Sequence, residues 1–395
     1  MNNFTFYTPT KVIFGENTIP QIGNELKKHE VNSVLLLAGS GSIKQNGVYD
    51  TTVKSLKENG ISFVEHFGVR PNPTVEHARE GKDLIAKNNL QAILAVGGGS
   101  VIDEAKAIAA GYFIDDIWNA FVQKEIPKKA LPVYTILTLS GTGTEANMNS
   151  VLSNHALKLK RAMYCEYTFP KVSIIDPTVQ MSLPWEQTVN GGIDAITHCM
   201  ENYFVGKNQE FCHNQESTIS ISEALMNTII KCIDGLQKDP NNYLCRANLA
   251  WASTCALNGL SAAGMGGGDW ATHRMQHAIS ALYPEVAHGA GLAALFPTWI
   301  RYCNENNKPQ FERWAKNVWN ANSVEDGVEN MVKKFKQWGS PTSISELIVD
   351  NTANARVPKE SLPAIVDTCE QISFQLGSVR ILKREDYAKI YEMAW

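Results

Sequence analysis

Residues Ala92 to Lys106 read Ala-Ile-Leu-Ala-Val-Gly-Gly-Gly-Ser-Val-Ile-Asp-Glu-Ala-Lys. The first five residues form a short, continuously apolar run that ends in glycine, which is typical of a strand buried on both faces of a parallel sheet. A helix is expected from Ser100 to about Gly111. Backbone N–H groups at a helix N-terminus can bind a phosphate, and glycine lets a ligand approach closely. This turn is not the G-x-G-x-x-G fingerprint, so a purely structural turn is the alternative.

The same strand, turn and helix pattern occurs on either side of this stretch. Strands are predicted at residues 33–38, 61–67, 132–139 and 172–175, and helices at about residues 18–29, 47–59 and 74–87. Two of these strands run into turns rich in glycine and hydroxyl groups, Gly39-Ser40-Gly41-Ser42 and Ser140-Gly141-Thr142-Gly143-Thr144-Glu145. Ligands of open α/β sheets bind at the carboxyl ends of the strands. The sequence therefore favours a nucleotide at this edge of the sheet.

The two ends of the chain differ from this pattern. Residues 4–14 alternate β-favouring residues around Pro9 and predict a short hairpin. After Pro184 no convincing strand follows, and helices are predicted at residues 185–205, 215–235, 240–265, 271–282, 288–304, 311–319, 324–338, 359–371 and 383–395. The expected fold is an α/β, Rossmann-like dinucleotide-binding domain in residues 1–180, followed by an all-α, metal-binding C-terminal domain in residues 181–395.

The helical half contains histidines at helical spacing. If Asp269 caps a helix, as aspartate commonly does, two histidines four residues apart project from one face of that helix. An aspartate and a histidine near residue 195 repeat the spacing, and a third histidine follows Pro284. Imidazole and carboxylate groups together suit a first-row divalent metal. Unrelated surface or core histidines are the alternative for any one of them. The candidate ligands or proton carriers are Asp194, His198, His273, His277 and His288.

The composition excludes several classes of protein. The chain has 395 residues, a formal net charge of −4 and a sequence pI near 6.2, so it lacks the basic field that nucleic-acid binding requires. The sequence has no stretch of eighteen apolar residues, so a membrane span is not expected. Its N-terminus has no basic segment followed by an apolar run, so secretion is not expected. The eight cysteines lack the Cys-x-x-Cys spacing, which fits a reduced chain. A cytoplasmic location is expected.

Four groups of residues together form a recognisable pattern. They are Gly97-Gly98-Gly99-Ser100-Val-Ile-Asp103-Glu-Ala-Lys106, Ser140-Gly-Thr-Gly-Thr-Glu145, Asp194 with His198, and the series His273, His277 and His288. This pattern resembles the iron-containing (group III) alcohol dehydrogenase family over most of the chain. The stretches Gly41–Asp50 and Gly268–His273 look most like the butanol dehydrogenase and NADPH-dependent aldehyde reductase branch of that family.

The resemblance implies a role for each of these residues. It implies a metal held by Asp194, His198, His273 and His288, although the chain between the last two is one residue longer than is usual in the family. It places His277 beside the metal. It also implies a homodimer and a cofactor-binding set of Gly39, Ser40, Ser42, Asn72, Gly97, Gly98, Gly99, Ser100, Asp103, Thr138, Thr142 and Lys160, with Thr138 and Thr142 near the nicotinamide and Lys160 near the ribose.

The expected reaction is hydride transfer between a nicotinamide cofactor and a primary alcohol or aldehyde such as butanol or butanal, with Fe²⁺, or Zn²⁺ in its place, polarising the oxygen. His277 is the candidate for passing the proton toward solvent. NADP(H) is expected in preference to NAD(H), because the loop after residue 38 has no carboxylate before Asp50 and contains Lys44. The alternatives are a glycerol-dehydrogenase-like polyol oxidoreductase, a dehydroquinate-synthase-like lyase, and a binding protein without catalysis.

Overall fold

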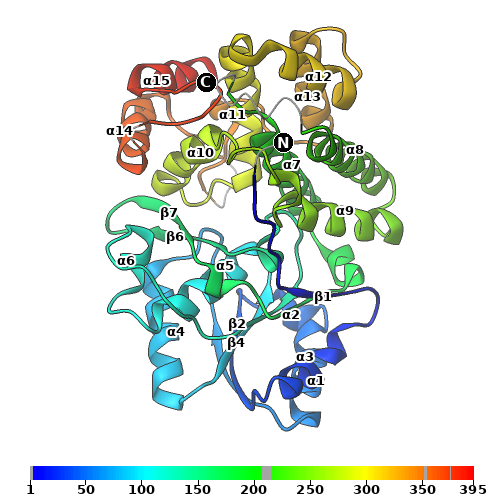
Figure 1. Cartoon of the computed structure of the whole chain (residues 1–395), viewed down its shortest axis with the longest axis vertical. Coiled ribbons are helices and arrows are strands. Elements are labelled where there is room, and N and C mark those ends of the chain that lie inside the picture. The colour runs from blue at the N-terminus through cyan, green and yellow to red at the C-terminus, as the bar shows by residue number, and fades with distance from the viewer. Residues whose placement is uncertain (1–2, 207–214, 351–353, 374) are drawn as a thin grey trace. The chain divides into compact units, whose positions relative to one another are not determined.

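The computed structural model describes residues 3–206, 215–350, 354–373 and 375–395. These residues form two compact units, drawn in Figure 1. The α/β unit comprises residues 8–183 and 241–250, and the helical unit comprises the described parts of residues 1–7, 184–240 and 251–395. The segments 1–7 and 241–250 thus belong to the unit that does not contain their neighbours in sequence.

A six-stranded sheet forms the centre of the α/β unit, in the order β1-β8-β5-β4-β2-β3. Every neighbouring pair in it is parallel, so the carboxyl ends of all the strands lie at one edge. The strands are β1 (Lys11–Phe14), β2 (Ser33–Ala38), β3 (Ser62–Phe67), β4 (Ala92–Gly97), β5 (Val133–Leu137) and β8 (Val172–Ile175). This parallel sheet agrees with the predicted α/β, Rossmann-like architecture.

Alternate residues of the central strands enter two separate hydrophobic cores. Leu35 and Leu37 of β2 lie in one core, whereas Leu36 and Ala38 lie in the other. Successive side chains of a strand point to opposite faces, so an apolar run of this kind can be buried only when helices cover both faces. One face carries α4 (Val75–Asn88), α5 (Gly99–Gly111) and α6 (Ile117–Phe121); the other carries α1 (Ile22–Lys28), α2 (Ser42–Gln45) and α3 (Val48–Glu58).

Two features of the α/β unit differ from the sequence-based expectation. The predicted hairpin at residues 4–14 is wrong, because Lys11–Phe14 pairs in parallel with β8. An antiparallel hairpin instead joins β6 (Asn149–Asn154) to β7 (Leu159–Tyr164), which no pattern predicted. Both pairings depend on partners that the local sequence does not specify, since strand preference is strongly dependent on context.

The helical unit begins after Pro184 and contains the predicted helices with modest shifts of their ends. They are α7 (Trp185–Tyr203), α8 (Glu216–Lys238), α10 (Ala271–Leu282), α11 (His288–Cys303), α12 (Lys308–Trp319), α13 (Val324–Gln337), α14 (Leu362–Ile372) and α15 (Arg384–Met393). The predicted helix at residues 240–265 is interrupted: α9 (Tyr243–Ala256) ends well before the short 3-10 turn Leu260–Ala262. Glycines with positive φ at 259, 264 and 266 end the helical geometry there.

Two further observations concern the described residues as a set. No helix among them is both long and apolar enough to cross a membrane. The cysteines among them, seven in number, are all free thiols.

Candidate metal and cofactor sites

Helix α7 provides the first two predicted metal ligands. Asp194 and His198 lie one turn apart on it, and both are buried, with about 5% of each residue exposed. The helix packs closely on α8 at Gly192, where a Cβ would lie 2.3 Å from Cδ1 of Ile233. A buried carboxylate such as that of Asp194 requires a compensating charge or hydrogen bonds.

The predicted capping role of Asp269 is wrong in part. Trp270 is the residue before α10, and it adopts a left-handed conformation with φ 62° that is costly for a bulky side chain. Asp269 still accepts a hydrogen bond from the first helical N–H, that of Ala271, at 3.1 Å. Its other oxygen accepts from the N–H groups of Ser378 (2.7 Å) and Val379 (2.8 Å), so its main role is to tie this turn to the segment before α15. Burial and the nearby Glu201 raise the pKa of Asp269 to about 7.

Three imidazoles converge on one oxygen of Asp194. The Nε2 atoms of His198, His273 and His288 lie 3.6, 3.7 and 3.6 Å from Oδ1 of Asp194. His273 comes from α10, and His288 is the first residue of α11, so three helices contribute to the cluster. The loop 283–287 accommodates its additional residue without moving His288 away from the other predicted ligands. The structure therefore brings together all four residues that the sequence predicted as ligands.

The charges of this cluster are strongly coupled. Burial raises the pKa of Asp194, but the imidazoles of His198, His288 and His273 lower it more, so that it lies well below its usual range. Burial lowers the pKa of His273, but the neighbouring carboxylates of Asp194 and Glu201 raise it to about 9. The carboxylate thus attracts positive charge to one point, where protons and a metal ion would compete.

The cluster fits a divalent metal. Oδ1 of Asp194 and Nε2 of His273 are buried polar atoms without a hydrogen-bond partner. Buried polar atoms rarely lack a partner in native proteins, so an ion is a reasonable partner for both. One carboxylate and three imidazoles form a donor set that suits iron(II) or zinc and does not discriminate strongly between them.

Two buried side chains that the sequence reasoning missed orient the histidines. Oε1 of Glu201 accepts from Nδ1 of His273 at 2.9 Å, and Nδ1 of His288 bonds with Oε1 of Gln276. Glu201 follows Asp194 by seven residues on α7, so helical spacing would have placed it on the same face. Gln276 precedes His277 and gave no comparable signal.

His277 lies beside the cluster. Its ring centroid is 5.6 Å from that of His288, on the α10 face that also carries His273. It is 9% exposed. This position agrees with a residue near the ligand set, and its role as a proton carrier stays a prediction.

The predicted cofactor turns lie at the carboxyl edge of the sheet. Gly39 and Thr138 directly follow β2 and β5, and Gly97–Ser100 begins with the last residue of β4; these three strands are adjacent in the sheet. The N–H of Thr138 donates to the carbonyl of Gly97 at 3.0 Å. A Cβ on Gly99 would lie 2.5 Å from Cγ2 of Thr142, so glycine is also needed where one turn packs on the other. The first N–H groups of α5 lie at this edge, and N–H groups at a helix N-terminus are a common phosphate-binding arrangement.

Two other predicted cofactor residues form a pair, and a third bonds within the protein. Nζ of Lys160, on β7, donates to Oδ1 of Asn72 at 2.7 Å. Asp103 accepts from the hydroxyl of Thr144 (2.6 Å) and from the N–H of Val151 (3.1 Å). Burial raises the pKa of Asp103 to about 6. Its assignment to the cofactor stays a prediction, because the contacts shown are to the protein.

The turn after β2 contains small residues and no carboxylate. Gly39, Ser40 and Gly41 lead into α2, which begins at Ser42. Lys44 lies over the ring of Phe67, with Nζ 4.2 Å from the centroid, and its Nζ is 3.9 Å from Oε2 of Glu65. The charge of this lysine is therefore partly offset by a glutamate on β3, which the sequence did not indicate.

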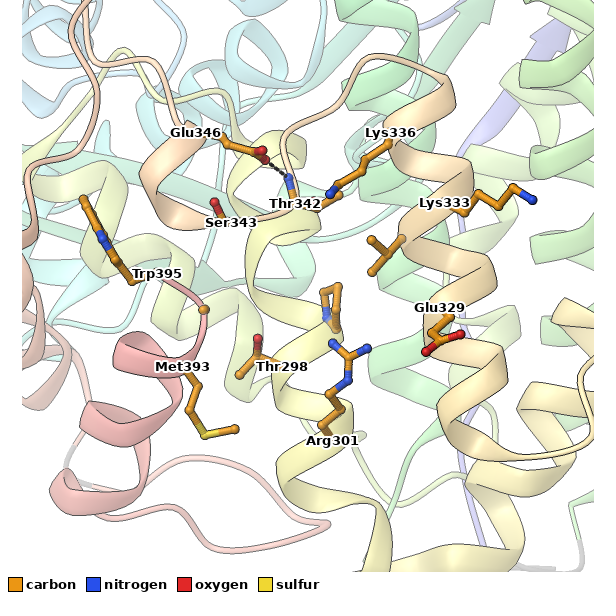
Figure 2. Close-up of a pocket in the computed structure, with 13 residues that line it drawn as sticks. Thr298, Arg301, Glu329, Lys333, Lys336, Thr342, Ser343, Glu346, Met393 and Trp395 are labelled. Atoms are coloured by element: carbon orange, nitrogen blue, oxygen red, sulfur yellow. Dashed lines mark hydrogen bonds between the residues drawn. The ribbon is translucent and has the colours of Figure 1, made fainter.

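The helical unit has a cavity of about 620 Å³ that none of the clustered histidines lines. Figure 2 shows the residues that line it. It is lined by Thr298 and Arg301 of α11, by Lys333 and Lys336 of α13, and by Glu346 among others. Thr298 is ten residues beyond His288 on one helix, or about 15 Å along its axis. Side chains of both charges line the cavity, so it has no single preference for an anion or a cation.

Comparisons with known proteins agree with this arrangement. Residues 9–177 match the family model described as iron-containing alcohol dehydrogenase, and residues 188–395 match that of the Fe-containing alcohol dehydrogenase family, C-terminal. The probable NADH-dependent butanol dehydrogenase 2 of Bacillus subtilis is 38% identical, and 99% of each chain is covered. The NADPH-dependent aldehyde reductase YqhD of Escherichia coli is 32% identical, and both chains are covered completely.

A solved structure extends the likeness to three dimensions. The crystal structure of the NADH-dependent butanol dehydrogenase A of Thermotoga maritima has a TM-score of 0.94 and 43% identity, over 100% of this chain and 99% of the other. Both halves of the chain match models of one family, and relatives above 30% identity align along the whole length. The chain therefore belongs to the iron-containing alcohol dehydrogenase family.

Proposed function

We propose that the protein transfers hydride reversibly between NADP(H) and a primary alcohol or aldehyde such as butanol or butanal. The observation that carries the proposal is the convergence of His198, His273 and His288 on one oxygen of Asp194. The names of two relatives, a probable butanol dehydrogenase and an aldehyde reductase, support the choice of an alcohol or aldehyde as the substrate.

The helical unit would hold the substrate oxygen. Asp194, His198, His273 and His288 would bind a divalent ion, Fe²⁺ or Zn²⁺, which when bound polarises a carbonyl and favours the alkoxide. Asp194, His198 and His273 are buried, which would keep bulk water away from the oxygen and so strengthen the electrostatic interaction. His277, next to His288, would relay the alcohol proton toward solvent.

The α/β unit would hold the dinucleotide. Gly97, Gly98, Gly99 and Ser100 would present N–H groups to the pyrophosphate, with Asp103, Thr138, Thr142, Asn72 and Lys160 completing the site. Gly39, Ser40 and Ser42 would face the ribose 2′ position. We propose NADP(H) over NAD(H), since this turn lacks the carboxylate that repels a 2′-phosphate. One relative is named as NADH-dependent and another as NADPH-dependent, so the preference is tested by comparing the two cofactors directly.

The proposal includes an assembly and a location. We propose a homodimer, which is supported by the exposed aromatic side chains Phe4, Phe6 and Tyr7 on a single segment. A cytoplasmic location is supported by the free cysteines among the described residues.

The function is tested by Asp194→Ala, which removes the carboxylate ligand. Metal content should fall to a small fraction of the wild type, and kcat/KM for aldehyde-dependent NADPH oxidation should fall by a factor on the order of 10³. Metal is measured by elemental analysis, and the wild type is assayed with and without a chelator. The matched control is Asp234→Ala, which removes a carboxylate that pairs with Lys334 on another helix and should keep metal and activity. Full metal and normal turnover in Asp194→Ala would contradict the proposal.

A further inference from the structure

Glu201 is a fully buried carboxylate on the same face of α7 as Asp194 and His198. It lies three residues after His198, so it is one helical turn deeper along the face that carries two of the proposed ligands. A glutamate without solvent contact requires hydrogen bonds to offset its lost hydration. The hydrogen-bond donors that contact Glu201 therefore indicate its role.

Four donors converge on the two oxygens of Glu201. Oε1 accepts from the backbone N–H of His273 at 3.1 Å, from Nδ1 of the same residue at 2.9 Å, and from the hydroxyl of Thr272. Oε2 accepts from the N–H of Trp270 at 2.6 Å. The two backbone N–H groups can only donate, so the carboxylate acts as the acceptor toward both of them.

This arrangement selects one tautomer of His273. Because Oε1 of Glu201 is an acceptor, the proton of the imidazole lies on Nδ1, and the lone pair of a neutral ring lies on Nε2. That Nε2 is the atom 3.7 Å from Oδ1 of Asp194. Glu201 thus turns the donor atom of His273 toward the centre of the cluster.

The orienting partner of His288 differs in charge. Gln276 is a neutral amide, and its Nε2 donates to the hydroxyl of Ser280 at 2.7 Å, which leaves its oxygen to face His288. Gly291 leaves room for it, because a Cβ there would lie 2.7 Å from Cγ of Gln276. Of the two orienting groups, Glu201 alone adds a negative charge.

We propose that Glu201 is a positioning residue for the metal: it fixes His273 in the ligand tautomer and supplies the second negative charge of the site. This inference rests on the proposed metal site. A divalent ion with Asp194 and Glu201 gives a net charge of zero, which lowers the cost of keeping an ion in a buried site. A carboxylate on the outer nitrogen also makes a histidine ligand more basic.

Glu201 has a structural role as well, and the two roles can be separated. Its bonds to the N–H groups of Trp270 and His273 satisfy donors at the start of α10, as a capping side chain would. Losing a cap lowers the stability of the metal-free protein. Losing a positioning residue lowers metal affinity beyond what the loss of stability explains.

The test is Glu201→Gln in the full chain, prepared metal-free and titrated with Zn²⁺ against a competing chromophoric chelator. The amide keeps the shape and an acceptor for His273 but removes the charge. The dissociation constant for Zn²⁺ should rise 10- to 100-fold. The control is Thr272→Val, which removes one donor to the same carboxylate without touching His273. It should lower the melting temperature of the metal-free protein and change the dissociation constant less than about threefold.

Each outcome decides between a positioning role and a purely structural role of Glu201. Zinc affinity within about threefold of the wild type in Glu201→Gln, with only the metal-free melting temperature lowered, overturns the positioning role while the metal site stands. A wild type that binds no zinc overturns the proposed metal site and this inference with it. Should Glu201→Gln fail to fold, the tautomer is measured in the zinc-loaded wild type by long-range ¹⁵N–¹H correlation of labelled histidine. A proton on Nδ1 of His273 supports the inference, and a bare Nδ1 overturns it.

Discussion

Gly39 is a single position at which one side chain would change the charge of the turn after β2. A Cβ there would lie 3.5 Å from the carbonyl oxygen of Val69, which is an ordinary contact, so the backbone accommodates a Cβ at this position. We expect Gly39→Asp to shift the ratio of kcat/KM for NADPH and NADH toward NADH by at least about tenfold, or about 1.4 kcal/mol, through repulsion of the 2′-phosphate. Gly39→Ala, which adds the Cβ without the charge, should keep the wild-type ratio. A wild type that already favours NADH tenfold would refute the proposed preference.

Half-buried His77 and buried Glu104 form a hydrogen-bonded pair in the α/β unit. Nδ1 of His77 lies 2.5 Å from Oε1 of Glu104, and its Nε2 lies 3.1 Å from the carbonyl of Phe67. Burial lowers the pKa of His77, but the hydrogen bond and charge of Glu104 raise it more, so it lies above its usual range. Burial also raises the pKa of Glu104. The folded protein therefore keeps this proton to higher pH than the unfolded chain does.

The stability that this pair contributes should depend on pH. It is complete below the ordinary histidine pKa of about 6.5 and is lost as the pH rises through the raised pKa of His77. We expect His77→Gln to lower the free energy of unfolding by about 1.5–3 kcal/mol at pH 6, and by progressively less toward pH 9. Denaturant unfolding across this range measures it, with His155→Gln at an exposed position as the control. A difference that does not change with pH would show that the pair keeps no extra proton.

The sequence pattern gave five candidate ligands or proton carriers, and the resemblance reduced them to the four proposed ligands, but neither identified the residues that orient the histidines. Asp194 with His198, and His273 with His277, could be paired because residues four apart share a helix face. The meeting of three helices at one oxygen is a matter of tertiary packing, and only the resemblance suggested it. Glu201 and Gln276 escaped notice because their partners lie on other turns or helices, and glutamate and glutamine are common on helices for other reasons.

The contact between α7 and α11 controls where His288 lies. Gly289 has no Cβ, and one added there would lie 2.1 Å from the carbonyl oxygen of Asn190 on α7. We expect Gly289→Ala to push the first turn of α11 away, to cost about 1–3 kcal/mol of stability, and to weaken metal binding. Gly327→Ala is the matched control, since its Cβ would meet Cβ of Ala315 at 2.8 Å between α12 and α13. Thermal melts and zinc titration should show destabilisation in both variants but weaker metal binding in Gly289→Ala alone.

Strands were predictable where burial on both faces makes them continuously apolar. This holds for β2, β4, β5 and β8, whose residues are almost all buried. Strand β7 has no such run, because it contains Lys160 and Arg161. Buried Lys160 donates a hydrogen bond to Asn72, 88 residues away, and a local window cannot contain that partner. The prediction for residues 4–14 was wrong for a similar reason, because β1 pairs with β8, which lies far away in the sequence.

The assembly of the whole molecule can be tested at its exposed aromatic segment. Phe4 and Phe6 are 48% and 51% exposed, and Tyr7 beside them is 61% exposed. We expect the wild type to have twice the chain mass of 43.7 kDa in light scattering after gel filtration, and Phe4→Ser with Phe6→Ser to shift it toward a single chain. Ile126→Ser, at a 75% exposed apolar position elsewhere, should leave the mass unchanged. A wild type with the mass of one chain would refute the proposed dimer.

The path of the chain between the two units limits how such a protein can be recombined. It passes from one unit to the other after residues 7, 183, 240 and 250, and α9 begins in one unit and ends in the other. Ala250 on that helix belongs to a core of the α/β unit. A chimaera made by exchanging residues 8–183 with a relative would therefore combine a transplanted core with ten residues of the recipient, residues 241–250. We expect such chimaeras to fold best when residues 241–250 are exchanged together with residues 8–183.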